Sequence, residues 1–195
     1  MRPDPREPYA LNQARTLAAM HRSIATILAI GAIACSTPPP PHWSSGGAPL
    51  MLGPAKWERP DDETVEIDLQ GRVLEGGSLK FVIDRSGRVI DDEDGPIGLL
   101  MPAGEFVGSS NRYLGHVGVT NAAPPHHDMA WLAVLPDGKV QYFNDEGERS
   151  EDGQWRGCEG ARHRTCTLVT HLIALRRYRG GSPRVGVGVG IMVPL

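Results

Sequence analysis

The chain has little of several features that usually narrow a protein's class. Its 195 residues include only 6% aromatics and three cysteines, and its formal net charge is −3. The longest strongly apolar run, residues 23–34, falls short of the roughly 20 residues that a membrane-spanning helix needs. These absences argue against a multi-span membrane protein, and the small net charge gives no electrostatic reason to expect nucleic-acid binding.

What the sequence has in quantity is turn-forming residues. It contains 24 Gly and 17 Pro, while 40% of its residues are hydrophobic. That hydrophobic content can bury a core, whereas frequent Gly and Pro interrupt long helices. We therefore expect a folded, turn-rich domain and not a helix bundle.

The N-terminal residues carry the pattern of an export signal. Arg22 directly precedes the uncharged run 23–34, whose length suits the apolar segment of a signal peptide. Ala32-Ile33-Ala34 then leads to Cys35. This stretch resembles the lipobox of bacterial lipoproteins, although Ala32 stands where that family prefers Leu. The resemblance implies cleavage before Cys35 and lipid, such as palmitate, on that cysteine.

The same resemblance implies an address in the cell. In Gram-negative lipoproteins, Asp after the lipidated cysteine retains the protein at the inner membrane, and Ser36 stands there instead. The chain is thus expected to be exported to the cell envelope and anchored in the outer membrane through Cys35. The alternatives for the apolar run are an uncleaved anchor and a buried core helix.

Three regions follow from this interpretation. Residues 1–34 are the predicted signal peptide, of which 1–19 are interpreted as a gene-start artefact because Met20 offers a tidier start. Residues 35–62, rich in Pro, Ser and Gly, are the predicted flexible, lipid-anchored linker. Residues 63–195 are the predicted β-rich globular domain.

The cysteine count fits an oxidising compartment. If Cys35 carries lipid, Cys158 and Cys166 remain as an even pair around a short polar stretch. We predict that they form a disulfide. Two buried free thiols, or a zinc site that adds His163, are the alternatives.

From residue 63 the apolar residues recur with a period of two, as strands require. Turn signals separate them at intervals of eight or nine residues, and they favour antiparallel hairpins that form a meander, a sandwich or a small barrel. A further possibility is that edge strands complete a partner's sheet. The predicted turns lie at 86–87, 94–95, 103–104, 110–111, 136–138, 145–147 and 152–153.

A weak internal repeat with a period of 17 aligns residues 88–100 with 105–117. Each copy has two apolar residues, a polar turn, and then the pattern apolar-Gly-x-apolar. Residues 82–119 are similar to the short repeats of β-flower and YD-type proteins, in which strands ending in Asp-x-x-Gly turns stack around an axis. Those families are largely structural or binding modules, so the likeness implies no reaction.

The C-terminal third is harder to interpret. The apolar residues of 167–178 fit either a strand or a helix, and the β-branched residues favour a strand. Valines and Ile191 alternate with glycines over 185–193, which predicts a further strand. Acidic residues gather in 58–105 and arginines in 156–184, and we expect these opposite charges to face each other or the solvent. The alternative is that exposed arginines meet anionic lipid or polysaccharide in a salt-sensitive interaction.

No motif identifies a catalytic residue. The sequence has no P-loop, no G-x-G-x-x-G after a strand, no H-E-x-x-H and no C-x-x-C, so we expect no cofactor. His126, His127 and Asp128 are the candidate metal ligands, although adjacent side chains on an extended loop seldom converge. The acidic run 91–94 is best explained as a solvated turn, and His116 as a structural histidine.

These features favour a non-enzymatic binding or structural module, lipid-anchored in the envelope, with an envelope protein or polysaccharide as partner. The alternative is a small metal-assisted envelope hydrolase that uses the region of His126, His127 and Asp128, with 91–94 nearby.

Overall fold

The structure, a computed structural model, describes residues 38–179. The predicted signal peptide, Cys35 and the predicted strand 185–193 lie outside the described residues.

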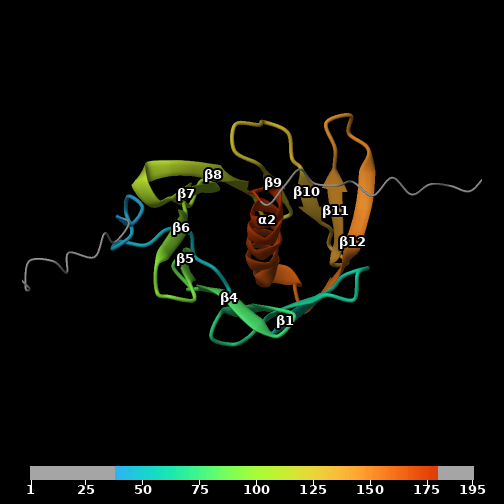
Figure 1. Ribbon diagram of the computed structural model, residues 1–195, viewed down its shortest axis with the longest axis horizontal. Coiled ribbons are helices and arrows are strands. Elements are labelled where there is room, and N and C mark those ends of the chain that lie inside the picture. The colour runs from blue at the N-terminus through green and yellow to red at the C-terminus, as the bar shows by residue number, and fades with distance from the viewer. Residues whose placement is uncertain (1–37, 180–195) are drawn as a thin grey trace, which may run out of the picture. The chain divides into compact units, whose positions relative to one another are not determined.

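Within this range the chain forms a closed antiparallel barrel (Figure 1). Each of twelve strands pairs with the next along the chain, and the first pairs with the last. The prediction of a mainly β, antiparallel fold is confirmed, and of the three architectures left open the chain adopts the barrel. No edge strand remains in this described sheet for a partner to complete. The strands are Ala55–Glu58 (β1), Thr64–Ile67 (β2), Arg72–Glu75 (β3), Ser78–Ile83 (β4), Arg88–Asp91 (β5), Pro96–Leu100 (β6), Glu105–Gly108 (β7), Arg112–Val117 (β8), Asn121–Ala123 (β9), Leu132–Val134 (β10), Lys139–Phe143 (β11) and Arg149–Arg156 (β12).

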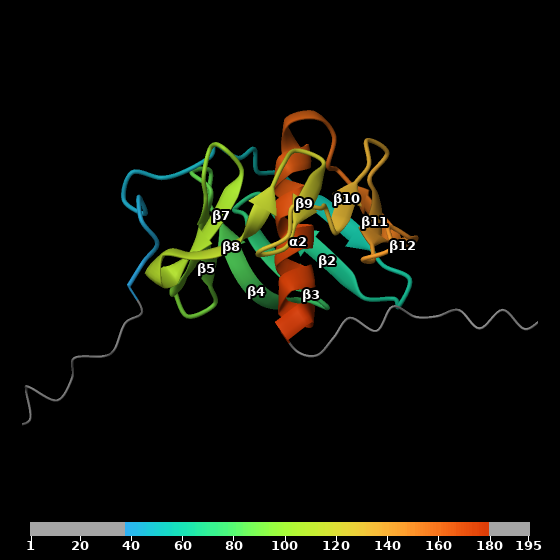
Figure 2. The ribbon, with the colours of Figure 1, turned by 90° about the horizontal axis from the view of Figure 1, so that it is seen from above.

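A helix occupies the middle of the barrel. After a 3₁₀ turn at Gly160–Arg162 (η2), helix α2 (His163–Arg179) runs between the two open ends (Figures 1 and 2). Every residue from Thr165 to Leu175 is buried. The strand interpretation of 167–178 is therefore wrong. Apolar and polar residues such as Thr167 and His171 are both buried along this helix, so it lacks the one-sided 3.6-residue pattern that identifies a surface helix.

Local hydrogen bonds explain the turns between strands. The Asp84 carboxylate accepts the backbone N–H groups of Ser86 and Arg88 at 2.8 and 2.9 Å, and Asp68 repeats this with Gln70 and Arg72. Such side-chain-to-backbone bonds fix tight turns. The predicted turns from 86–87 through 145–147 all lie between strands.

The turn predicted at Asp152-Gly153 is wrong, because these residues lie inside β12. The pairing of β11 with β12 shifts register between Lys139 and Gln141, opposite this pair. Gly153 has φ +84°, and a Cβ there would lie 1.9 Å from the Glu58 carbonyl oxygen. An Asp-Gly pair fits a bulge as well as a hairpin turn, since both need a residue in the left-handed backbone conformation.

The 17-residue repeat corresponds to two successive hairpins, β5–β6 and β7–β8. Both contain a register shift at the equivalent position, between Val89 and Ile90 in one and between Phe106 and Val107 in the other. The likeness to β-flower and YD-type proteins stays an expectation.

The barrel begins within the region predicted as linker. Ala48 and Trp57 are fully buried, and strand β1 closes the sheet. The Ala48 amide also donates to the Leu100 carbonyl at 2.6 Å. The Pro- and Gly-rich composition of 38–54 hid this packing, so the predicted start of the domain at residue 63 is too late.

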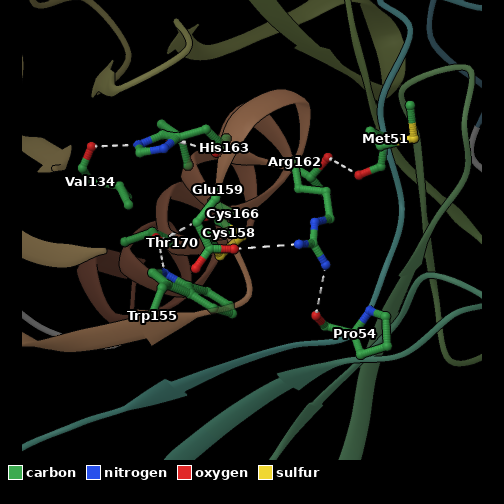
Figure 3. Close-up of a disulfide and its surroundings, with 12 residues drawn as sticks. Met51, Pro54, Val134, Trp155, Cys158, Glu159, Arg162, His163, Cys166 and Thr170 are labelled. Carbon is green, nitrogen blue, oxygen red and sulfur yellow. Dashed lines mark hydrogen bonds and ion pairs between the residues drawn. A yellow bond between two sulfur atoms is a disulfide. The ribbon is translucent and has the colours of Figure 1, made fainter. Parts of the chain in front are cut away.

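The disulfide between Cys158 and Cys166 joins the segment after β12 to the first turn of α2, as predicted (Figure 3). The sulfur atoms are therefore not free thiols, and the zinc alternative is wrong. His163 Nε2 instead lies 2.7 Å from the Val134 carbonyl oxygen. Next to the bridge, the Trp155 indole donates to Thr170 Oγ1 at 2.9 Å.

The closing strands hold a charged group inside the barrel wall. The Arg59 side chain is only 3% exposed and forms ion pairs with Asp61, Glu63 and Asp152. Its guanidinium also stacks over the Trp57 ring. Burial raises the pKa of Asp152, and the charge of Arg59 opposes that rise.

The expectation that opposite charges face each other is confirmed for two arginines. Arg156 pairs with Glu58 at 2.9 Å, and Arg177 pairs with Glu63 at 3.2 Å and with Glu75 at 3.7 Å.

Candidate functional site

The site with the most side-chain chemistry is a pocket of about 300 Å³ between β8, β9 and the loop that follows β9. Polar side chains supply much of its wall, and three alanines form the remainder. The polar residues are Tyr113, His116, Asn121, His127 and Asp128.

A bulge in β8 brings two of these residues together. Tyr113 and His116 are three positions apart, so a regular strand would point them to opposite faces. Opposite the register shift in β7, Leu114 is the extra residue of β8, and Leu114 and Gly115 are both buried. The extra residue reverses the alternation, and Tyr113 and His116 therefore line the same pocket.

Gly115 is required at this bulge. Its φ is +124°, and a Cβ there would lie 2.4 Å from the Ala123 carbonyl oxygen and 2.8 Å from the His171 ring. The close approach packs β8 against β9 and against α2. The bulge that brings Tyr113 and His116 to the pocket is thus packed against the helix.

The local electrostatics favour a neutral or cationic ligand. Burial raises the pKa of the Tyr113 phenol, and the carboxylates of Glu105 and Asp128 raise it further. Tyr113 therefore keeps its proton at neutral pH and both donates and accepts hydrogen bonds. Negative charge nearby would repel an anionic group that entered the pocket.

The structure brings together only part of the predicted candidate site. His127 and Asp128 line the pocket. His126 has φ +64°, and its ring packs edge-on against the Tyr113 ring with 6.4 Å between the ring centroids. Across residues 38–179, no three His, Cys, Asp or Glu side chains are grouped as they would be to hold a metal ion. The metal alternative for His126, His127 and Asp128 thus finds no third ligand among these residues.

The acidic run 91–94 is not part of the pocket lining. The Asp91 carboxylate accepts the backbone N–H groups of Glu93 and Gly95, at 3.0 and 2.6 Å, which closes the turn between β5 and β6. Asp94 has φ +64° in the same turn. These contacts agree with the interpretation of the run as a turn.

Sequence reasoning missed Tyr113 and Asn121 as site residues. Both stand in short strands whose alternation is interrupted, and nothing in the local sequence marks the bulge except Gly115. His116 was considered as a structural histidine, but its side chain is exposed and lines the pocket.

Another histidine, His171, is not part of the pocket lining and has a structural role. His171 is fully buried, its Nε2 lies 3.0 Å from the Leu114 carbonyl, and its Nδ1 lies 3.2 Å from the Trp131 indole nitrogen. Indole N–H groups only donate, so Nδ1 accepts and Nε2 donates. Burial lowers the pKa of His171 to about 4, against the smaller opposing effect of the Leu114 bond.

Two findings complete the description. In the described part of the chain, no helix has both the length and the apolar character needed to cross a membrane. Comparisons of the chain with protein-family models, with curated proteins and with solved structures find no match.

Proposed function

We propose that this protein is a lipid-anchored module of the bacterial cell envelope that binds a neutral saccharide unit of an envelope polysaccharide. The observation that carries the proposal is the pocket of Tyr113, His116, Asn121, His127 and Asp128, in a barrel whose interior holds the buried helix α2.

The pocket offers the groups that a sugar needs. Hydroxyl groups of a saccharide both donate and accept, so Asp128 can accept from them while the Asn121 amide does both. The Tyr113 ring supplies apolar surface for the carbon face of a sugar. A few convergent polar groups with an aromatic wall are typical of small-molecule pockets.

The negative surroundings narrow the ligand class further. Glu105 and Asp128 lie close enough to raise the pKa of Tyr113. A phosphorylated or carboxylated sugar would meet these charges, and no Lys or Arg is among the residues that line the pocket. A neutral sugar avoids this repulsion.

The disulfide supports the proposed compartment. Such bridges persist in oxidising spaces outside the cytoplasm, and the lipobox-like residues before Cys35 point to the same export route. A single acyl chain holds a protein only marginally at a membrane, while two or more chains anchor it stably.

Titration calorimetry with neutral fragments of envelope polysaccharide tests the ligand. We expect saturable binding that either of two variants weakens by about tenfold, because Asn121→Ala removes a hydrogen bond in the pocket and Asp128→Asn replaces a charged acceptor with a weaker neutral one. Asp145→Asn is the matched control, since Asp145 is exposed on the loop between β11 and β12. Equal affinity in all variants would contradict the assigned pocket.

Fractionation of cells that express the full chain tests the anchor. We expect the parent protein in the membrane fraction and Cys35→Ser in an uncleaved or released form, because the lipid acceptor is gone. The same trimmed, membrane-bound product from both proteins would reject the lipid anchor and leave the pocket untouched.

A further inference from the structure

A second cavity, of about 220 Å³, lies between the C-terminal half of α2 and strands β6 to β8. Its wall is mostly apolar and deeply buried: Phe106, Leu114, Leu172 and Leu175 are each at most 6% exposed. The rest of the lining is Pro96, Ile97, Ser109 and two exposed arginines, Arg112 and Arg176. The cavity thus has an apolar interior and cationic groups beside it.

Two buried glycines make room for apolar side chains that line this cavity. Gly98 of β6 and Gly108 of β7 face each other in the sheet. A Cβ on Gly98 would lie 2.6 Å from the Phe106 ring, and one on Gly108 would lie 2.7 Å from Leu114 Cδ1. Phe106 and Leu114 thus pack directly over the two glycines, and a larger residue at either position would displace a side chain of the cavity wall.

The two arginines at the cavity are not used by the fold. The neighbouring Arg177 pairs with Glu63 and Glu75. Neither Arg112 nor Arg176, by contrast, has a side-chain hydrogen bond or ion pair with any residue that the structure describes. An anionic group bound beside the cavity would accept charge-assisted hydrogen bonds from guanidinium groups of this kind.

We propose that this cavity binds the carboxylate form of a medium-chain fatty acid, with the chain between Phe106, Leu114 and Leu172 and the carboxylate at Arg112 and Arg176. Arginine presents a planar fork that matches a carboxylate. The space equals roughly seven water molecules. A methylene group is of similar size, so the cavity suits a chain of about six to eight carbons.

The test is titration calorimetry on the released, soluble form of the Cys35→Ser chain, and the probe is sodium octanoate. We expect one saturable site. Each methylene from butanoate to octanoate should improve affinity by about fourfold, and longer chains should gain little. Octanol and octylamine should bind at least about tenfold more weakly, because neither offers an anion to the arginines.

Variants locate the site. Arg112→Gln with Arg176→Gln should weaken octanoate by about tenfold, while Arg149→Gln, exposed on β12, should change nothing. Gly108→Ala keeps an allowed backbone, since φ is −91°, and pushes the Leu114 side chain into the cavity. It should abolish octanoate binding while leaving the thermal midpoint within a few degrees.

Methyl NMR then separates this site from any other. Octanoate should shift the signals of Ile97, Leu172 and Leu175 in the parent and not in Gly108→Ala. No saturable binding, equal binding of octanol, unchanged affinity in the double glutamine variant, or shifts elsewhere in the barrel would each overturn the proposal.

Discussion

Acid should destabilise the fold through His171, at the centre of the barrel. Its pKa is about 4 in the folded protein against 6.5 in its ordinary state. The unfolded chain therefore takes up a proton below about pH 6.5 that the folded chain refuses until about pH 4. The stabilising effect of the neutral ring is complete above that window and is lost as the pH falls through it.

The size of the effect follows from the shift. One pKa unit corresponds to about 1.4 kcal/mol, and the window spans about 2.5 units. Between about pH 7.5 and about pH 4.5 the free energy of unfolding should fall by about 2.5 kcal/mol on account of His171 alone. The remaining part is lost at still lower pH.

Urea denaturation followed by tryptophan fluorescence measures this fall. The comparison protein is His171→Gln, whose amide can still donate to the Leu114 carbonyl but does not titrate. Carboxylates such as Asp152 and Asp68 titrate in both proteins, so their contributions cancel in the difference between the two curves. If the stabilities of parent and variant change in parallel with pH, His171 is not the buried neutral base described above.

Three further perturbations test how the barrel is closed. Loss of the bridge in Cys158→Ala with Cys166→Ala should lower the free energy of unfolding by about 2.5 kcal/mol, measured in urea, because the bridge constrains the unfolded chain; no change would contradict a bridge that pins α2. Gly138→Ala should lower the free energy of unfolding by about 3 kcal/mol and Gly147→Ala by about 1 kcal/mol, measured by thermal unfolding. Both glycines have positive φ, but only a Cβ on Gly138 would meet the Trp155 carbonyl oxygen. Equal losses would contradict this close contact. Arg59→Met should lower the free energy of unfolding by roughly 2 kcal/mol, because it leaves the partly buried Asp152 carboxylate without its cation; a loss no larger than that of an exposed-arginine variant in chemical denaturation would argue against this ion pair.

The hairpins were predictable because their turns are encoded locally. Asp84 fixes its turn through hydrogen bonds to residues two and four positions later, and such bonds need no distant partner. The disulfide was predictable for a similar reason, since Cys158 and Cys166 lie close in sequence. Closure into a barrel depends instead on β1 meeting β12, a pairing that residue alternation cannot distinguish from a sandwich.

The features that sequence reasoning missed depend on long-range contacts. The sequence of α2 favoured a strand because the helix is buried on every face, so its buried residues do not show a 3.6-residue period. Gly153 was predicted in a turn because a bulge and a turn both need a residue with positive φ. The pocket stayed hidden because Tyr113 and Asn121 converge only after the bulge in β8 and its pairing with β9.

Intact-mass and peptide analysis of the mature protein, taken from the membrane of an expressing cell, tests the central claim most directly. The account predicts an N-terminal Cys35 that carries acyl chains, together with one peptide pair linked through Cys158 and Cys166. A mature chain that keeps the residues before Cys35 without acyl mass, or that has free thiols at both later cysteines, would contradict it.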